Sequence, residues 1–313
     1  MKFRFHSFNE MSEILMSEGI SAEAYAVKRE AFISGQSEET ILKELDRRIA
    51  ITRASIIKGL TVSQNSRSGL TKGAAAAFFR VKRQFVTNEF FRRSMAYALA
   101  INEVNACGGK IVAFPTAGSS GIIPGTIWAW WDTHNGGGEN GVPHDKEGEA
   151  LSLPRMPEPP FLPKLRGAFL VASLAGILIA QQATIAGSEG GCQAECGSAG
   201  AMAACALSHL EDLSLDECFS AAALSLKNTL GLACDPVAGL VEVPCVKRNT
   251  FMAANALTAV DLTLAGIKSV IPFDDVVLAM KQIGDIMPVN LRENALGGLA
   301  ATPSGILLRD RLE

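Results

Sequence analysis

The chain has 313 residues, of which 48% are hydrophobic and 19% are charged, with 29 Lys and Arg against 32 Asp and Glu. The formal net charge of −3 argues against a nucleic-acid-binding protein, which usually carries a basic excess or a basic face. So much apolar sequence also excludes a largely disordered chain.

The first sixty residues, 1–60, predict three helices. No apolar signal-peptide segment follows the first six residues, so we expect a cytoplasmic protein. Ser7 opens the first helix in a capping-box pattern, Ser21 and Ser37 are N-cap candidates for the next two, and Gly35 ends the second. Apolar side chains recur at helical spacing through the third helix: Ile41, Leu45, Ile49 and Ile56.

The middle of the chain alternates helices with loops of small residues. Residues 63–73 predict a polar loop, and a helix is predicted from about 88 to 106, where Cys107 and a glycine pair end it. Residues 111–125 are dense in turn-forming residues. The Gly and Pro clusters of residues 128–164 argue against any helix or strand there, so we expect a long surface excursion within the domain.

From 164 to 268 the sequence is apolar and rich in alanine, in segments long enough for buried helices. These segments are interrupted at 187–191 and at 234–244. The longest apolar run, 167–180, is shorter than the ~20 residues that span a bilayer, so we expect a core helix and no membrane association. Alternating strand patterns are scarce, and the predicted class is mainly α.

Three of the seven cysteines lie where helices are predicted to start or stop. Cys192 follows two glycines, Cys234 precedes Asp-Pro, and Cys245 follows a proline. Three thiolates from separate loops suit an iron–sulfur cluster or zinc, and three ligands leave a fourth position open, as in catalytic metal sites. Their spacing is not that of a compact metal knuckle, so spacing alone leaves the metal open. The other four cysteines are expected to pack as small apolar side chains: Cys107, Cys196, Cys205 and Cys218.

Four blocks of the sequence resemble the iron–sulfur-dependent L-serine dehydratases, specifically the alpha chain of the two-chain type. The blocks are residues 66–71, 115–124, 190–199 and 234–249, and the two that contain cysteines are the most specific. The resemblance extends over most of residues 10–310. It implies a mainly helical chain, with residues 1–313 forming one large catalytic domain with long irregular loops. It also implies a [4Fe–4S] cluster on Cys192, Cys234 and Cys245, with the fourth iron left for the substrate.

The implied reaction is the conversion of L-serine to pyruvate and ammonia. An open iron would act as a Lewis acid on the 3-hydroxyl while a base removes the α-proton. The resulting aminoacrylate would become an imine, which water hydrolyses. The sequence shows no lysine with the phosphate-cradling glycine loop of a pyridoxal phosphate enzyme, the usual alternative for this chemistry.

The resemblance also implies that small polar residues hold the substrate. They are Ser66, Ser68, Thr116, Gly118, Ser119, Ser120, Gly121 and Asn249. Residues 115–121 are expected to present backbone N–H groups to the serine carboxylate, although an ordinary turn has the same composition. For the two serines of residues 66–71, a local cap is the alternative to a substrate contact.

Lys247 and Arg248 directly follow a predicted ligand and are the catalytic candidates. Both would neutralise a negative cluster and carboxylate, and Lys247 is also a candidate base; the alternative is an exposed basic pair. Glu195 is expected either beside the site or as a carboxylate at a helix N-terminus. No histidine lies in these blocks, so the base stays unassigned, and the family's separate beta chain is an expected partner that could supply it. Self-association is the other expected contact.

Two other interpretations stay open. The nearest is a related cluster-dependent lyase that acts on L-cysteine or L-threonine. The other is a non-catalytic iron–sulfur sensor, in which the blocks at 66–71 and 115–124 would have no task. Cys196 stands where the family usually has a small apolar residue, and it is expected either to pack or to act as an alternative ligand.

Overall fold

The computed structural model describes residues 3–62, 65–135 and 163–312, and within these ranges every regular element is a helix. The α-helices are α1 (Phe8–Glu18), α2 (Ala22–Ser34), α3 (Glu38–Thr61), α4 (Ala74–Arg80), α5 (Glu89–Ala106), α6 (Ile122–Asn135), α7 (Pro163–Gln182), α8 (Gly187–Gly190), α9 (Ser198–Leu210), α10 (Leu215–Lys227), α11 (Cys245–Leu264), α12 (Phe273–Ile286) and α13 (Pro303–Asp310). Shorter turns are the π-helix η1 (Gln193–Gly197) and the 3₁₀ helices η2 (Val237–Gly239), η3 (Val289–Leu291) and η4 (Gly298–Ala301). The predicted mainly α class is confirmed.

The N-terminal helices begin where their caps predict. Ser21 and Ser37 accept hydrogen bonds from the first-turn amides of α2 and α3, and Gly35 ends α2 in the left-handed conformation that glycine favours. Ser7 likewise caps α1, but the Glu10 carboxylate accepts from His6 N–H and not from Ser7, so the capping box is only half formed.

One prediction in the middle of the chain is wrong. Helix α6 continues through residues 128–135, although the sequence from 128 to 164 was expected to contain no helix, and α7 already begins at 163. Trp128 and Trp130 are buried, and the Trp128 indole N–H donates to Thr52 Oγ1 at 2.9 Å. Pro124 is tolerated because it lies in the first turn of α6, where amides have no intrahelical acceptor. The rest of the expected excursion, 136–162, lies outside the described residues.

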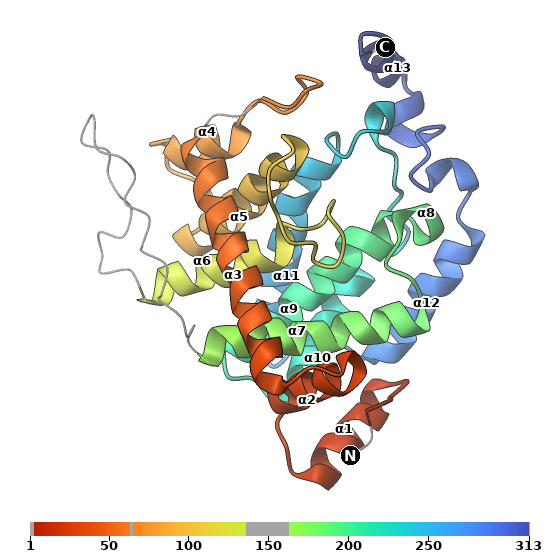
Figure 1. The fold of residues 1–313 in the computed structure, drawn as a ribbon. Coiled ribbons are helices and arrows are strands. Elements are labelled where there is room, and N and C mark those ends of the chain that lie inside the picture. Colours follow the sequence, from red (N-terminus) through yellow and green to blue (C-terminus); the bar gives the residue numbers. More distant parts are fainter. Residues whose placement is uncertain (1–2, 63–64, 136–162, 313) are drawn as a thin grey trace.

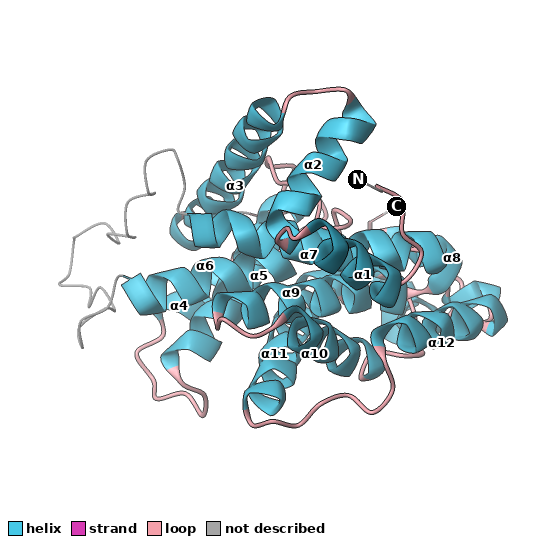
Figure 2. Ribbon diagram, turned by 90° about the horizontal axis from the view of Figure 1, so that it is seen from below, coloured by secondary structure: helices cyan, strands magenta, loops and turns pink. Residues whose placement is uncertain are grey.

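Helix α9 forms the centre of the fold (Figures 1 and 2). All its residues except His209 are buried, and it contacts α6, α7, α10 and α11. Its side chains are mainly Ala, Gly and Ser, so neighbouring helices can approach its backbone closely. At its N-terminal end α9 continues directly from η1, and this end leads into the region of the cysteines.

Helix α7 is the one described helix that is long and apolar enough to cross a membrane. It packs against α9 and α2, and 56% of its most apolar window is buried inside the protein. That burial is typical of a core helix, as the sequence predicts for 167–180.

A buried ion pair joins three helices on the side of the fold away from α8 and α12. The Arg53 guanidinium of α3 donates to both carboxylate oxygens of Asp132 in α6, at 2.7 and 3.0 Å. The Tyr97 hydroxyl of α5 donates to the same carboxylate at 2.7 Å, and the Trp128 ring lies beneath the guanidinium, 4.8 Å from ring centroid to Cζ. Both charges are therefore compensated within the core.

Candidate functional site

The three predicted cysteine ligands lie together at breaks in the helices. Cys192 lies between α8 and η1, Cys234 lies in the loop after α10, and Cys245 is the first residue of α11. All three side chains are buried. The Cys234 thiol lies 4.0 Å from Glu195 Oε2, and Cys234 and Cys245 are both close enough to Cys192 for their thiol pKa values to respond to its charge.

Backbone hydrogen bonds hold these segments against one another. Gln193 N–H donates to Leu232 C=O at 3.0 Å, and Cys234 N–H donates to Leu291 C=O at 2.9 Å. Gly191 has a φ of 74°, and a Cβ there would lie 2.6 Å from the Met287 sulfur. Glycine at this position therefore permits both the left-handed turn and the close approach of the C-terminal segment.

A fourth thiol belongs to the same group. Cys196, one helical turn after Cys192, is buried, and it is close enough to Cys192 for each thiol to shift the pKa of the other. The neighbouring thiols of Cys196 and Cys234 are the main cause that lowers the pKa of the Cys192 thiol well below its usual value. Cys205 and Cys218 are buried elsewhere, between α9 and α10, as expected for packing residues.

Two carboxylates face the cysteines. One ligand atom each from Glu195, Cys234 and Glu293 lies within 4.8 Å of the other two. Burial raises the pKa of Glu195 to about 7, and the nearby charges of Glu293 and Cys192 act in the same direction. Glu293 has a φ of 59° and its N–H donates to Cys234 C=O at 2.7 Å. No local sequence pattern predicts Glu293 at the site, because only the tertiary fold brings this loop to Cys234.

Arg248 supplies positive charge to the group. Its guanidinium donates to Ala233 C=O at 2.9 Å and to Asp235 Oδ1 at 3.4 Å, and it also hydrogen-bonds the Cys192 sulfur. Burial works against the charged guanidinium, but the interactions with Cys192, Cys196 and Asp235 together outweigh it and raise the pKa of Arg248. Lys247, in contrast, is exposed, and its charge is felt at Glu103.

The loop 115–121 lies beside this group and is tied to it by Asn249. The Asn249 amide donates to Gly118 C=O at 2.8 Å and to Cys245 C=O at 2.9 Å, and its oxygen accepts from Gly121 N–H at 3.1 Å. Thr116 hydrogen-bonds the Glu195 carboxylate. A Cβ at Gly118 would lie 3.8 Å from Glu195 Oε2, so the loop backbone borders the site directly.

Several amides of that loop are already engaged. Ser119 N–H donates to Thr116 Oγ1 and Ser120 N–H donates to Ala117 C=O, in addition to the bond from Gly121 to Asn249. The predicted presentation of free N–H groups to a carboxylate is therefore not available from these three amides. Ser120 Oγ is buried with no hydrogen-bond partner among the described residues.

Ser66 and Ser68 lie beside a carboxylate of the protein, that of Glu242. Their hydroxyls lie 3.0 Å apart, and Ser68 donates to Glu242 at 2.7 Å. Thr71 donates to the other oxygen of Glu242 at 2.6 Å. Glu242 lies in the turn before Cys245, so the block at 66–71 braces the segment that carries a predicted ligand. Ser68 and Glu242 also line a cavity of about 520 Å³.

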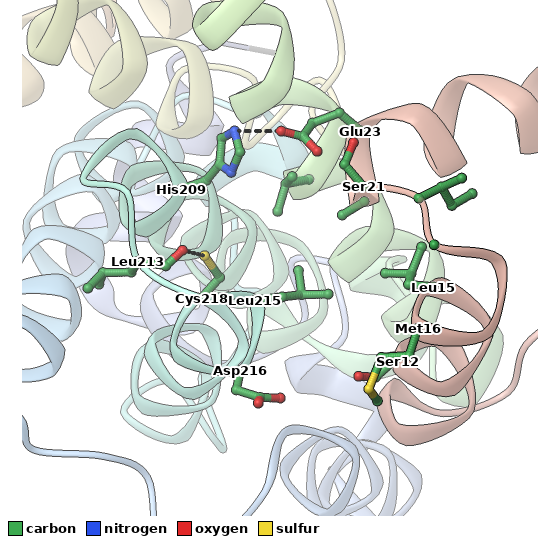
Figure 3. A pocket seen from close by; sticks show the side chains of 14 residues that line it. Ser12, Leu15, Met16, Ser21, Glu23, His209, Leu213, Leu215, Asp216 and Cys218 are labelled. Atoms are coloured by element: carbon green, nitrogen blue, oxygen red, sulfur yellow. Dashed lines mark hydrogen bonds and ion pairs between the residues drawn. The ribbon is translucent and has the colours of Figure 1, made fainter.

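A second cavity, of about 550 Å³, lies on another part of the molecule (Figure 3). It is bordered by α1, α2, α9 and α10, and His209 Nε2 lies 3.3 Å from a Glu23 carboxylate oxygen at its wall. None of the predicted site residues lines it. The group of cysteines, carboxylates and Arg248 is therefore the candidate functional site.

Comparisons with known proteins identify the family of the chain. The sequence model of the serine dehydratase alpha chain matches residues 10–300. The chain is 38% identical to a probable L-serine dehydratase alpha chain of Bacillus subtilis, over 98% of this chain and 95% of that one. It is also 38% identical to an L-serine dehydratase alpha chain of Peptoniphilus asaccharolyticus, over 96% and 95%. An L-serine dehydratase of Streptomyces coelicolor is 32% identical over 96% of this chain but only 61% of its own length. The chain belongs to the serine dehydratase alpha chain family.

Proposed function

We propose that this chain is the catalytic subunit of an L-serine ammonia-lyase that forms pyruvate and ammonia with a [4Fe–4S] cluster bound at the cysteine group. The observation that carries the proposal is the convergence of Cys192, Cys234 and Cys245 from three separate segments. The family and the names of its relatives support the substrate, L-serine.

The residues present fit such a cluster. Thiolates are the ligands that iron–sulfur clusters take, and the three thiols come from three chain segments that are fixed by backbone hydrogen bonds. Arg248 offsets the negative charge that thiolates and sulfides bring into a buried site. When bound through three thiolates, the cluster supplies an open iron that acts as a Lewis acid on the 3-hydroxyl.

The protein's own part in the reaction is to hold serine and move a proton. Glu195 lies between the thiols and the loop 115–121, and we assign it the acceptance of the α-proton because of that position. Asn249 and Thr116 keep the loop in register with the cysteines. Loss of the α-proton and of the 3-hydroxyl as water gives aminoacrylate, whose imine tautomer is hydrolysed to pyruvate and ammonia.

The partner and the location are proposed on the same basis. An alpha chain implies a beta chain, and the Streptomyces relative is long enough to carry further sequence beyond the part that this chain matches. We propose that a separate beta chain completes the enzyme, and that it works in the reducing cytoplasm, where exposed iron–sulfur chemistry is protected.

The test is an anaerobic assay of the full chain. The chain is purified, supplied with iron and sulfide, and assayed for pyruvate formation from L-serine, with and without a candidate beta chain. Turnover that disappears in air and returns with iron supports the proposal. Faster turnover of L-cysteine or L-threonine would point to the related lyase, and a loaded cluster that is inert toward all three amino acids would point to the sensor.

A further inference from the structure

The cysteine group contains one thiol more than the proposed cluster needs. Cys196 is as buried as Cys192, with 2% of each residue exposed, and it follows Cys192 by one helical turn. Cys245 is also near enough to act on Cys196 electrostatically. This part of the protein therefore has four buried thiols, and not three.

The backbone holds Cys196 in that place. It lies in η1, where the Ser198 N–H reaches back five residues to Gln193 C=O, the hydrogen bond of a π-turn. Such turns are rare and occur often at functional sites. Residues four apart on a helix share one face, so Cys192 and Cys196 present their sulfurs to the same side.

Buried contacts on the other side of η1 fix its orientation in the fold. The Gln193 side chain is fully buried, and it donates to Met280 C=O at 3.0 Å and accepts from Gly231 N–H at 2.9 Å. A Cβ at Gly197 would lie 2.5 Å from Thr229 Oγ1, so this turn is packed directly against the end of α10. Cys196 is therefore preorganised toward the other thiols.

We infer that Cys196 is a fourth thiol ligand, which occupies the open corner of the cluster until substrate replaces it. The inference rests on the proposed function. A thiolate is preferred by cluster iron over the carboxylates of Glu195 and Glu293, which are the other donors at the site. The Cys196 thiol would pass its proton to the neighbouring Glu195 carboxylate when its sulfur binds iron, and it would take that proton back when the serine hydroxyl displaces it, which leaves Glu195 free to accept the α-proton.

The two remaining buried thiols provide the matched comparison. Cys205 lies on α9, the helix that continues from η1. Its thiol neighbours that of Cys218, and no carboxylate or guanidinium contributes to the shift of its pKa. It shares the burial of Cys196 but not its surroundings. Replacing Cys205 therefore removes a buried thiol without touching the candidate ligands.

The experiment compares clusters that keep or lose one iron. Wild type, Cys196→Ala, Cys196→Val and Cys205→Ala are loaded anaerobically without serine, oxidised with a small excess of ferricyanide, and examined by electron paramagnetic resonance for the [3Fe–4S] form. A corner without a protein ligand loses its iron on oxidation. We expect the [3Fe–4S] signal per cluster to be several-fold larger in both Cys196 variants than in wild type and Cys205→Ala.

Each outcome decides one claim. Equal [3Fe–4S] signals in all four proteins would overturn the role of Cys196 while leaving the proposed function intact. No cluster in wild type would overturn the proposed function itself. The valine variant, which fills the volume of the lost thiol, and thermal unfolding by circular dichroism separate a ligand effect from misfolding.

Discussion

Two buried polar regions of this molecule are built on opposite principles. Around Arg53 and Asp132, a cation, an anion, a tyrosine hydroxyl and an indole ring satisfy one another within the packed helices α3, α5 and α6. Around Cys234, two carboxylates and four thiols are gathered with one guanidinium, at places where helices break. The first region has its charges paired; the second has several acidic groups for one cation.

This difference in charge pairing distinguishes a structural region of the core from the candidate functional site. Burying like charges costs free energy unless something else binds them. At the cysteine group, neighbouring acidic groups and burial raise the pKa values of Glu195, Cys234 and Cys245, so these groups keep their protons until something positively charged binds them. Both regions are buried, so the comparison depends on charge pairing and not on exposure.

The largest effect is expected from the cysteines themselves. Cys192→Ala, Cys234→Ala and Cys245→Ala should each abolish cluster binding and pyruvate formation, because each removes one of the three proposed permanent ligands, which a ligand that substrate displaces does not replace. Visible absorption and the serine assay measure both losses. The matched controls are Cys205→Ala and Cys218→Ala, which should keep both. If Cys205→Ala lost its colour and Cys234→Ala kept it, the assignment of ligands would be wrong.

The next effect tests the proton acceptor. Glu195→Gln keeps the size and shape of the side chain but cannot take a proton, so kcat for L-serine should fall by about 10²–10⁴ while iron content is unchanged. Glu189→Gln, an exposed residue of α8, is the control and should leave kcat unaltered. An unaltered kcat in Glu195→Gln would remove this residue from the mechanism.

A substitution in the Arg53–Asp132 ion pair should change the stability of the protein and not its catalytic activity. Asp132→Ala leaves Arg53 buried without its carboxylate and should lower the free energy of unfolding by about 3–5 kcal/mol. Denaturation by urea measures this loss. Asp310→Ala, which removes an exposed ion pair with Arg309, is the control and should change little. A cluster that disappears from folded Asp132→Ala protein would show that the two regions are not independent.

A smaller effect lies at the border of the site. Asn249→Ala removes the hydrogen bonds that tie the loop 115–121 to the start of α11, at a cost of about 1–3 kcal/mol in stability, and it should raise KM for serine. Asn255→Ala lies on the same helix but bonds Ser225, so it should lose stability without a change in KM. Steady-state kinetics of both variants distinguish the two roles.

The smallest effect is expected at a helix cap far from the site. Ser21→Ala removes the side-chain acceptor for the Ala24 amide and should destabilise the protein by about 1 kcal/mol. Thermal unfolding measures this change, and kcat should be that of wild type. A change in kcat would mean that α2 influences the cysteine group.

Local chemistry explains which parts of the fold were predictable. Ser21, Ser37 and Asn88 cap their helices with their own side chains, so a few neighbouring residues carry the whole signal. The breaks at Cys192 and Cys234 were equally visible, because glycine and proline interrupt helices wherever they lie. Helix α6 was missed since its first turn tolerates Pro124 and the burial of Trp128 depends on Thr52, far away in sequence.

The candidate site was predictable only in part for the same reason. Its cysteines and Arg248 lie in blocks that resemble a known family, whereas Glu293 reaches the site through a backbone contact with Cys234 that no local pattern encodes. Ser68 and Thr71 donate to Glu242, and Ser66 hydrogen-bonds Ser68, so only tertiary contact identifies the carboxylate that this block holds. Polar residue types predict that a contact is made, but not with which group.

The central claim is that the cysteine group binds a [4Fe–4S] cluster, and metal analysis tests it most directly. The full chain, reconstituted anaerobically and freed of unbound iron, is analysed for iron, acid-labile sulfide and zinc. We predict iron and sulfide in equal amounts at one cluster per chain, and their loss in Cys234→Ala. Zinc without sulfide, or iron and sulfide that persist in Cys234→Ala, would contradict the account.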